Sequence, residues 1–368
     1  MDSLEQKLEE RRKKNSLRVL KESNTYLLDF SSNDYLGLAR SEKLKKLILK
    51  EYESGKYLNG STGSRLITGN STLIQKTEEY LSEKFRFPAC LVFNSGYMAN
   101  LAIFSSIPQR GDTIIYDELS HACIKDGCRL SLAKRIPFLH NNLEDLERKL
   151  RTAEGQAYVA CESVYSMDGD MAPLGELSEL CQSYNARLIV DEAHSTGVWG
   201  EAGAGLVNEL GLNNSVFAVV YTFGKGMGIH GAAVASSQSA KDFLINFSRP
   251  FIYTTAPSAF ELISIQCAFD YLKTHPSLQL NVLSKSKLFN QQLAEFSTPS
   301  PIKSVLIGGN DKTKALATEL QVAGYDVRPI LSPTVKEGTE RLRICLHSFN
   351  SEEEIILLCD QLKRHLGQ

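Results

Sequence analysis

The sequence lacks the features that mark several large classes of protein. Its 368 residues include 41 Lys and Arg against 43 Asp and Glu, so the formal net charge is only −2. A chain without excess positive charge has no electrostatic bias toward nucleic acid or an anionic membrane. No apolar run approaches the ~20 residues of a membrane-spanning helix, and the charged stretch 1–14 lacks the apolar core of a signal peptide. We therefore expect neither nucleic-acid nor membrane partners.

Paired cysteines are also missing. Eight cysteines occur, and no two of them form a CxxC pair. Most stand in apolar patterns, which is typical of buried, reduced thiols in a cytoplasmic protein. His121, Cys123 and Cys128 lack the second ligand pair of a zinc site, so we expect no metal.

Short apolar runs alternate with helical patterns through the middle of the chain. The runs at 89–93, 113–116, 158–161, 188–190 and 216–221 have the length of buried strands. Such alternation predicts an α/β fold with a parallel sheet covered on both faces. A charged helix is expected at 2–22, with further helices at 42–53 and 71–86. After about residue 240 the pattern changes to that of a smaller α+β domain.

The strongest local motif is Val219–Gly228, where Lys225 ends a buried strand inside a glycine-rich turn. A P-loop would need Ser or Thr after the lysine, but Gly226 follows it. Gly226, Gly228 and Gly231 match the dinucleotide fingerprint as a string. An apolar run follows them instead of a helix, and no acid stands about 20 positions on, which disfavours a dinucleotide oxidoreductase. A Schiff-base lysine remains.

A second motif, Ala186–His194, places Asp191 at the end of another buried strand. A carboxylate there can keep the nitrogen of a pyridine-ring cofactor protonated. His194, expected one helical turn further on, would donate a hydrogen bond. The alternative is that Asp191 only caps the next helix.

Other strand ends carry polar residues as well. Gly96 and Tyr97 open a helix whose free N–H groups suit an anion, although this is also a common strand–helix turn. His121 equally suits a helix cap, and Ser166 a turn. No Gly-x-Ser-x-Gly elbow occurs, which argues against an α/β-hydrolase.

These motifs together resemble the α-oxoamine synthases, enzymes of the aspartate-aminotransferase fold group that use pyridoxal 5′-phosphate (PLP). The resemblance covers nearly the whole chain. It is most specific in the segments 30–38, 163–174, 190–194 and 222–228. It implies PLP fold type I, with a mostly parallel seven-stranded sheet covered by helices in a large domain. The expected boundaries are 1–42 for an N-terminal segment, 43–240 for the large PLP-binding domain and 241–368 for the small domain.

The resemblance also implies roles for individual residues around the cofactor. Lys225 would form the Schiff base, Asp191 would pair with the pyridine nitrogen, His194 with the ring hydroxyl, and His121 would stack on the ring. The residues implied to position the ring and phosphate are Gly96, Tyr97, Ser166 and Thr222. Thr255 resembles a phosphate contact that the neighbouring subunit lends, which implies a homodimer.

Substrate contacts are implied at four further positions. Arg343 resembles the arginine that grips the amino-acid carboxylate, a task that suits a fork-shaped cation. Arg18 and Thr334 match substrate contacts of biotin-pathway members. The family segment Ile-Arg-Pro-Pro-Thr-Val reads Ile-Leu-Ser-Pro-Thr-Val at 330–335, so Leu331 replaces an arginine. Arg328 lies three positions earlier, and whether it takes over the contact stays open.

The implied reaction is a decarboxylative condensation of L-alanine with a pimeloyl thioester to 8-amino-7-oxononanoate, in biotin biosynthesis. The carrier of the acyl group, coenzyme A or an acyl carrier protein, stays open. Sister reactions keep the cofactor but use glycine with acetyl-CoA, or serine with a long-chain acyl thioester. A PLP-binding protein without activity is a further alternative, although every catalytic position is filled.

Overall fold

The computed structural model describes residues 2–20, 22 and 26–367, and these form two compact units. The large unit comprises Leu36–Tyr165 and Met171–Gln279. The small unit comprises Met1–Tyr35, Ser166–Asp170 and Leu280–Gln368. Compactness does not by itself define a domain that folds alone, so the boundaries expected at 42 and 240 stay a prediction.

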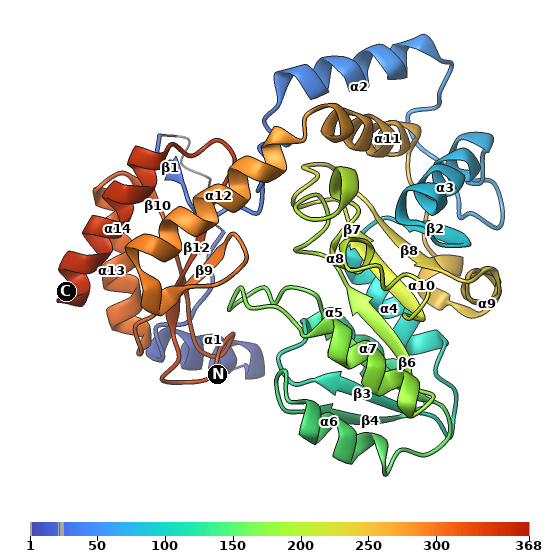
Figure 1. Cartoon of the computed structure of the whole chain (residues 1–368), viewed down its shortest axis with the longest axis horizontal. Helices are drawn as coiled ribbons and strands as arrows, with labels where there is room; N and C mark the ends of the chain where they lie inside the picture. Colours follow the sequence, from blue (N-terminus) through green and yellow to red (C-terminus); the bar gives the residue numbers. More distant parts are fainter. Residues whose placement is uncertain (1, 21, 23–25, 368) are drawn as a thin grey trace. The chain divides into compact units, whose positions relative to one another are not determined.

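A seven-stranded sheet forms the centre of the large unit, in the order β2-β8-β7-β6-β5-β3-β4 (Figure 1). Its strands are β2 (Ala89–Phe93), β3 (Thr113–Asp117), β4 (Lys134–Phe138), β5 (Ala157–Glu162), β6 (Arg187–Asp191), β7 (Ala218–Thr222) and β8 (Ala232–Ser236). Only β8 runs antiparallel to its neighbours. The predicted seven-stranded, mostly parallel sheet is thereby confirmed.

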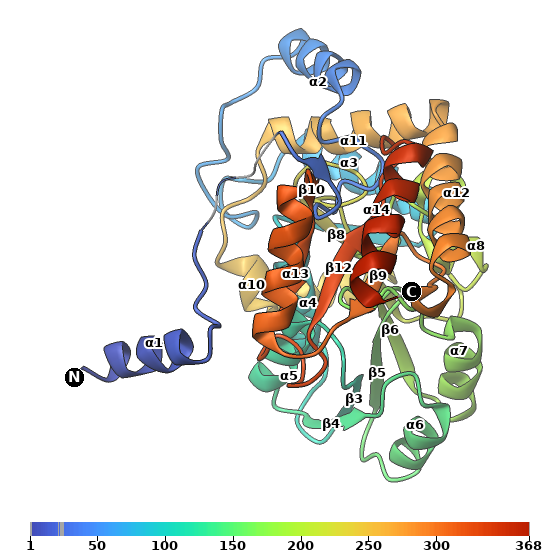
Figure 2. The same cartoon turned by 90° about the vertical axis from the view of Figure 1, so that its left-hand side faces the viewer.

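Helices cover both faces of this sheet, because its central strands are apolar on both sides. Figure 2 shows α4 (Gly96–Ser106) and α5 (Ala122–Leu130) on one side of the strands, and α6 (Leu143–Leu150) and α7 (Leu174–Ser183) on the other. The remaining helices of the unit are α2 (Glu42–Ser54), α3 (Thr72–Phe85), η1 (Glu201–Gly203), α8 (Leu206–Glu209), α9 (Gln238–Phe247), α10 (Arg249–Ile252) and α11 (Ala259–Thr274).

The small unit combines helices with short strands. An antiparallel sheet contains β11 (Arg328–Ile330), β12 (Arg341–Cys345) and β9 (Ile302–Leu306) in that order, and β1 (Leu28–Asp29) pairs with β10 (Tyr325–Asp326). The helices are α1 (Ser3–Lys13), α12 (Ser277–Gln292, whose residues 280–292 belong here), η2 (Ala294–Phe296), α13 (Asn310–Val322) and α14 (Glu352–Leu366). Apolar side chains of β9, β12, α13 and α14 share one buried core.

Two sequence-based expectations were wrong. The N-terminal helix ends at Lys13 instead of reaching residue 22, because none of its residues is buried and Asn15 adopts a left-handed backbone conformation (φ 48°); residue 21 lies outside the described residues. No helix follows Asp191, since residues 193–198 form successive turns. Asp191 is therefore not a helix cap, and His194 is not one helical turn away from it.

Candidate active site

Polar residues end four neighbouring strands of the large sheet. Asp117 closes β3, Glu162 closes β5, Asp191 closes β6 and Thr222 closes β7, and all four are buried. These strands run parallel, so their carboxyl ends meet at one edge of the sheet, where open α/β folds bind ligands. The sheet thus concentrates ionisable groups at one place.

Asp191 is held by two donors. Asn100, from α4, donates its Nδ2 proton to Asp191 Oδ2 at 2.7 Å, and the N–H of Ala193 donates to Oδ1 at 2.9 Å. Asp191 is 4 % exposed and Asn100 is 1 % exposed. No cation forms an ion pair with Asp191 anywhere in the described ranges 2–20, 22 and 26–367. A buried carboxylate without a counter-ion is costly, and a protonated ring nitrogen would supply that counter-ion.

Lys225 lies within hydrogen-bond distance of His194, with 2.9 Å between Nζ and Nε2. The turn that carries Lys225 is closed by hydrogen bonds from Gly228 N–H to Lys225 O (2.9 Å) and from Ile229 N–H to Phe223 O (3.0 Å). Gly228 has φ 65°, and a Cβ at Gly226 would collide with the Thr196 carbonyl. Glycine is required at both positions, and this fixes the backbone of Lys225.

The start of α4 offers an anion site. Ser95 caps the helix, and a side chain at Gly96 would collide with the methyl group of Thr222. Asn94 donates from Nδ2 to the Thr255 carbonyl at 2.9 Å, which brings Thr255 of the same chain to this helix start. Tyr97 is exposed, and its hydroxyl donates to Asp126.

His121 is the N-cap of α5, as one sequence alternative held, with Nδ1 accepting the Cys123 N–H at 3.2 Å. Burial and the positive charge of Lys225 lower the pKa of His121, against the opposing effect of Asp191. The net effect favours the neutral form of the ring. Capping and stacking use different parts of the residue and do not exclude each other.

The small unit holds the remaining candidates. Arg343 is 8 % exposed, and it donates to Ser166 O (2.5 Å), Asn33 Oδ1 (2.9 Å) and Cys345 Sγ (2.9 Å). Within the described part of the chain no carboxylate pairs with Arg343, whereas nearby Arg341 pairs with Asp168. Ser166 thus belongs with Arg343 in this unit.

Arg18 and Thr334 were predicted as a pair of substrate contacts, and they meet. Arg18 Nη2 donates to Thr334 Oγ1 at 2.9 Å, and both side chains are otherwise exposed. Next to Thr334 lies a cavity of about 400 Å³. Its lining residues are Lys7, Glu10, Arg11, Lys14, Ser16, Asn310, Ser332 and Pro333.

Arg328 is engaged elsewhere. Its guanidinium lies 2.7 Å from Asp326 Oδ1 and 3.1 Å from Oδ2, in an ion pair between residues two positions apart. Among the described residues, no hydrogen bond or ion pair joins Arg328 to Arg18 or Thr334, so nothing supports Arg328 as the replacement for the arginine missing at Leu331.

Asn100, Glu162 and the α1 cations were missed by the sequence analysis. Asn100 stands alone among apolar residues of α4, and this isolated polar position was the available signal. Taken together, a buried carboxylate without a counter-ion, a lysine fixed beside a histidine, and a helix start with a glycine cradle fit PLP. Asp191, His194, Lys225, Thr222 and Gly96 would hold it.

Comparison with known proteins places this site in a family. The family model for class I and II aminotransferases matches residues 25–362. The chain belongs to the class I and II aminotransferase family.

Relatives within this aminotransferase family agree with the resemblance to α-oxoamine synthases. An 8-amino-7-oxononanoate synthase of Emericella nidulans is 40% identical over 385 aligned residues, covering 96% of this chain and 93% of the relative. The solved 8-amino-7-oxononanoate synthase of Francisella tularensis has a TM-score of 0.79 at 27% identity, covering 94% of this chain and 99% of that one. The serine palmitoyltransferase of S. paucimobilis, solved with a bound PLP–myriocin aldimine, has a TM-score of 0.89 at 25% identity, covering 99% and 96%. The predicted family is confirmed.

Proposed function

We propose that this protein is a PLP-dependent acyltransferase. It condenses L-alanine with a pimeloyl thioester, giving 8-amino-7-oxononanoate, CO₂ and the free thiol carrier, as a step of biotin biosynthesis. The observation that carries the proposal is the buried Asp191, which has no counter-ion among the described residues, in a chain whose Lys225 lies beside His194. Relatives 34% to 40% identical bear the name of this synthase.

PLP supplies, when bound, an electron-withdrawing ring that lowers the energy of a deprotonated α-carbon. With PLP bound, Asp191, held by Asn100, would keep the ring nitrogen protonated. His121 would pack on the ring face, and His194 would donate to the ring hydroxyl. The N–H groups at Gly96 and Tyr97, with the Thr222 hydroxyl, would bind the phosphate.

Lys225 moves the protons of the reaction. Its Nζ takes the α-proton of alanine and later returns a proton to the same carbon after CO₂ has left. The 2.9 Å contact with His194 Nε2 fixes the direction of Nζ. The α-carbon forms a new bond to the acyl carbonyl carbon while the thiolate leaves.

Arg343 binds the carboxylate of the amino acid. Its guanidinium is nearly buried, and its contacts among the described residues are Ser166 O, Asn33 Oδ1, Cys345 Sγ and the Tyr35 hydroxyl, none of which is a carboxylate. A nearly buried arginine with no carboxylate partner among the described residues is costly. The carboxylate of the substrate can pair with it through two parallel hydrogen bonds. Ser166 and Asn33, which accept from Arg343, hold the fork in place.

Arg18 and Thr334 bind the far carboxylate of the pimeloyl chain. The neighbouring cavity adds Lys7 and Arg11 of α1 and Lys14, which caps the end of α1, against a single acidic lining residue, Glu10. This positive environment favours an acyl group that ends in a carboxylate.

The active protein is a homodimer in this proposal, with Thr255 lent to the partner's phosphate site. Exposed apolar residues gather on two segments of the large unit that lie side by side, since Ala256 N–H donates to Gly63 O at 3.0 Å. They include Leu66, Ile67 and Tyr253, which are 53 %, 82 % and 73 % exposed. Patches of this kind mark protein interfaces, and a second copy of the chain is the occupant we propose.

A cytoplasmic location agrees with the cysteines. All eight are free thiols, and seven of them are buried, as expected of a reducing compartment. In residues 2–20, 22 and 26–367, no helix has both the length and the apolar character needed to cross a bilayer.

The decisive experiment follows free thiol and the mass of the amino ketone product, with purified protein, PLP and matched substrate pairs. L-alanine with pimeloyl-CoA should give 8-amino-7-oxononanoate, and pimeloyl-acyl carrier protein should be compared with it. Serine with palmitoyl-CoA tests the second candidate, which the TM-score of 0.89 to a serine palmitoyltransferase favours. Condensation of serine but not of alanine would replace the first assignment by the second.

A further inference from the structure

A second buried carboxylic acid, Glu162, lies beside Asp191. Glu162 ends β5 and is 2 % exposed, and the strand register places it directly opposite Asp191 on β6. No Lys, Arg or His forms an ion pair with Glu162 in the part of the chain that the structure describes. The roles proposed above leave this residue without a task.

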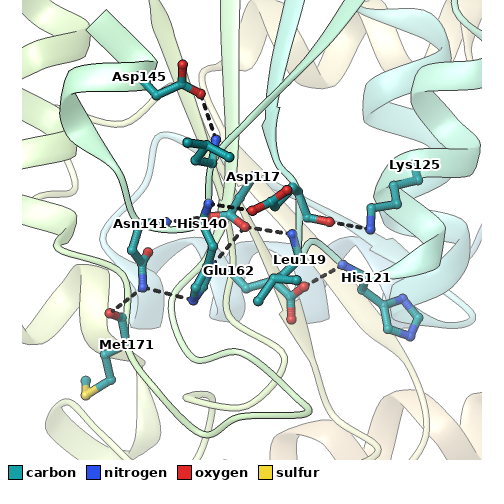
Figure 3. Close-up of polar contacts among 11 residues, drawn as sticks. Asp117, Leu119, His121, Lys125, His140, Asn141, Asp145, Glu162 and Met171 are labelled. Carbon is teal, nitrogen blue, oxygen red and sulfur yellow. Dashed lines mark hydrogen bonds and ion pairs between the residues drawn. The ribbon is translucent and has the colours of Figure 1, made fainter. Parts of the chain in front are cut away.

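Glu162 makes one defined contact. Its Oε1 accepts the backbone N–H of His121 at 2.5 Å, as Figure 3 shows. The segment that leads to His121 is also held by Leu119 N–H donating to Asp117 Oδ1 (2.8 Å) and by Lys125 Nζ donating to Glu118 O (2.6 Å) (Figure 3). Of these three bonds, only the one from Glu162 fixes His121 itself.

The surroundings favour the uncharged form of this acid. Burial and the neighbouring charge of Asp191 raise the pKa of Glu162 to about 8, with a smaller contribution of the same sign from Asp117. Lys225 and the His121 N–H act in the opposite direction and are outweighed. Two carboxylates in register cannot both ionise easily, and Asp191 has the donors that stabilise its charge.

We propose that Glu162 is a positioning residue that stands neutral beside Asp191 and sets the place of the His121 ring through its bond to the His121 N–H. Of the two carboxyl groups in register, this division leaves the negative charge on Asp191, the one proposed to pair with the ring nitrogen. The inference rests on the proposed function only in taking His121 as the neighbour of the cofactor ring.

The test compares Glu162→Gln with Glu162→Ala. Glutamine keeps the size and the accepting oxygen without a charge, whereas alanine leaves the His121 N–H without this acceptor. The first readout is the ring signal of His121 in the ¹⁵N-histidine-labelled apoprotein, assigned with a His121→Gln variant. The second readout is the dissociation constant for PLP from absorbance titration.

Glu192→Ala is the matched control. Glu192 is also buried with a pKa raised to about 8 by burial, but it accepts the N–H groups of Leu206 (2.9 Å) and Val207 (2.6 Å) at the start of α8. Its loss should lower the melting temperature without moving the His121 signal.

The expected result is that Glu162→Gln keeps the His121 signal and binds PLP within about threefold of wild type. Glu162→Ala should shift that signal and weaken PLP binding up to about tenfold, the effect of losing one hydrogen bond. Equal damage from Gln and Ala would mean that a negative charge is required, and it would overturn the proposal. An unchanged His121 signal in Glu162→Ala would overturn it too. Neither readout needs turnover. A failed condensation assay would therefore refute the proposed reaction without contradicting this inference.

Discussion

Replacing Asn100 by alanine should weaken the cofactor site mainly by removing its hydrogen bond to Asp191. The Asn100 Nδ2 donates to Asp191 Oδ2 at 2.7 Å, and both side chains are buried, so water cannot easily take over the bond. A hydrogen bond to a charged group contributes about 1.5–3 kcal/mol. At about 1.4 kcal/mol per factor of ten, the dissociation constant for PLP should rise about 10- to 150-fold.

Absorbance titration of the apoprotein measures this constant, and Asn208→Ala serves as the control. Asn208 is equally buried, but its Nδ2 has no hydrogen-bond partner among the described residues, so its removal breaks no such bond. Asn100→Asp should bind PLP more weakly than Asn100→Ala, because it sets a second carboxylate against Asp191. If Asn100→Ala bound PLP within twofold of wild type, Asp191 would not depend on this bond, and the reasoning would be refuted.

Four further outcomes are expected. Lys225→Ala should abolish turnover in a thiol-release assay while the protein stays folded by circular dichroism; residual activity near the wild-type rate would exclude Lys225 as the proton carrier. Asp191→Asn should keep the fold and lose most activity, because an amide cannot hold the ring nitrogen protonated, and wild-type exchange of the alanine α-proton would argue otherwise. Arg343→Ala should raise the KM for alanine well over tenfold, as a lost buried charge contact of about 2–5 kcal/mol requires; an unchanged KM would remove Arg343 from the substrate site. Burial lowers the pKa of Lys303 to about 7 from its ordinary 10.5. Between pH 7 and pH 10.5, Lys303 is therefore protonated in the unfolded chain but largely unprotonated in the folded protein. The free energy of unfolding should rise with pH across this range by about a few kcal/mol. Urea titrations should show that rise in wild type and its absence in Lys303→Met.

The residues at the strand ends could be predicted from sequence because their signals are local. A short apolar run ends, a polar residue follows, and parallel topology gathers such ends at one edge. Asp191, Lys225 and His121 were found in this way, although their roles came from a family resemblance. The edge strand β4 was missed, since Lys134–Phe138 carries two cations and a proline and lacks an apolar pattern. An edge strand tolerates these residues because one side of it needs no partner.

Supporting residues could not be predicted in the same manner. The bond between Asn100 and Asp191 joins positions 91 residues apart, and neither sequence segment contains a pattern that predicts the contact. Glu162 has the sequence context of an acid before a turn, and only the register with Asp191 reveals that two carboxylic acids share the edge. Their effects depend on which strands are neighbours, and that order comes from packing of the whole sheet.

In the small unit, one residue that departs from the expected family motif changes which cations can bind the substrate carboxylates. Leu331 stands where the family resemblance implied an arginine, and Arg328 was the nearby cation considered as its replacement. Arg328 lies opposite Arg343 on the adjacent strand, so two guanidinium groups would repel each other if neither had an anion. Asp326 neutralises Arg328 at 2.7 Å, which leaves Arg343 as the cation available to an amino acid. We therefore propose that the far carboxylate of the acyl chain depends on Arg18 and on Lys7, Arg11 and Lys14 beside the cavity, a set that sequence comparison at position 331 alone would not identify.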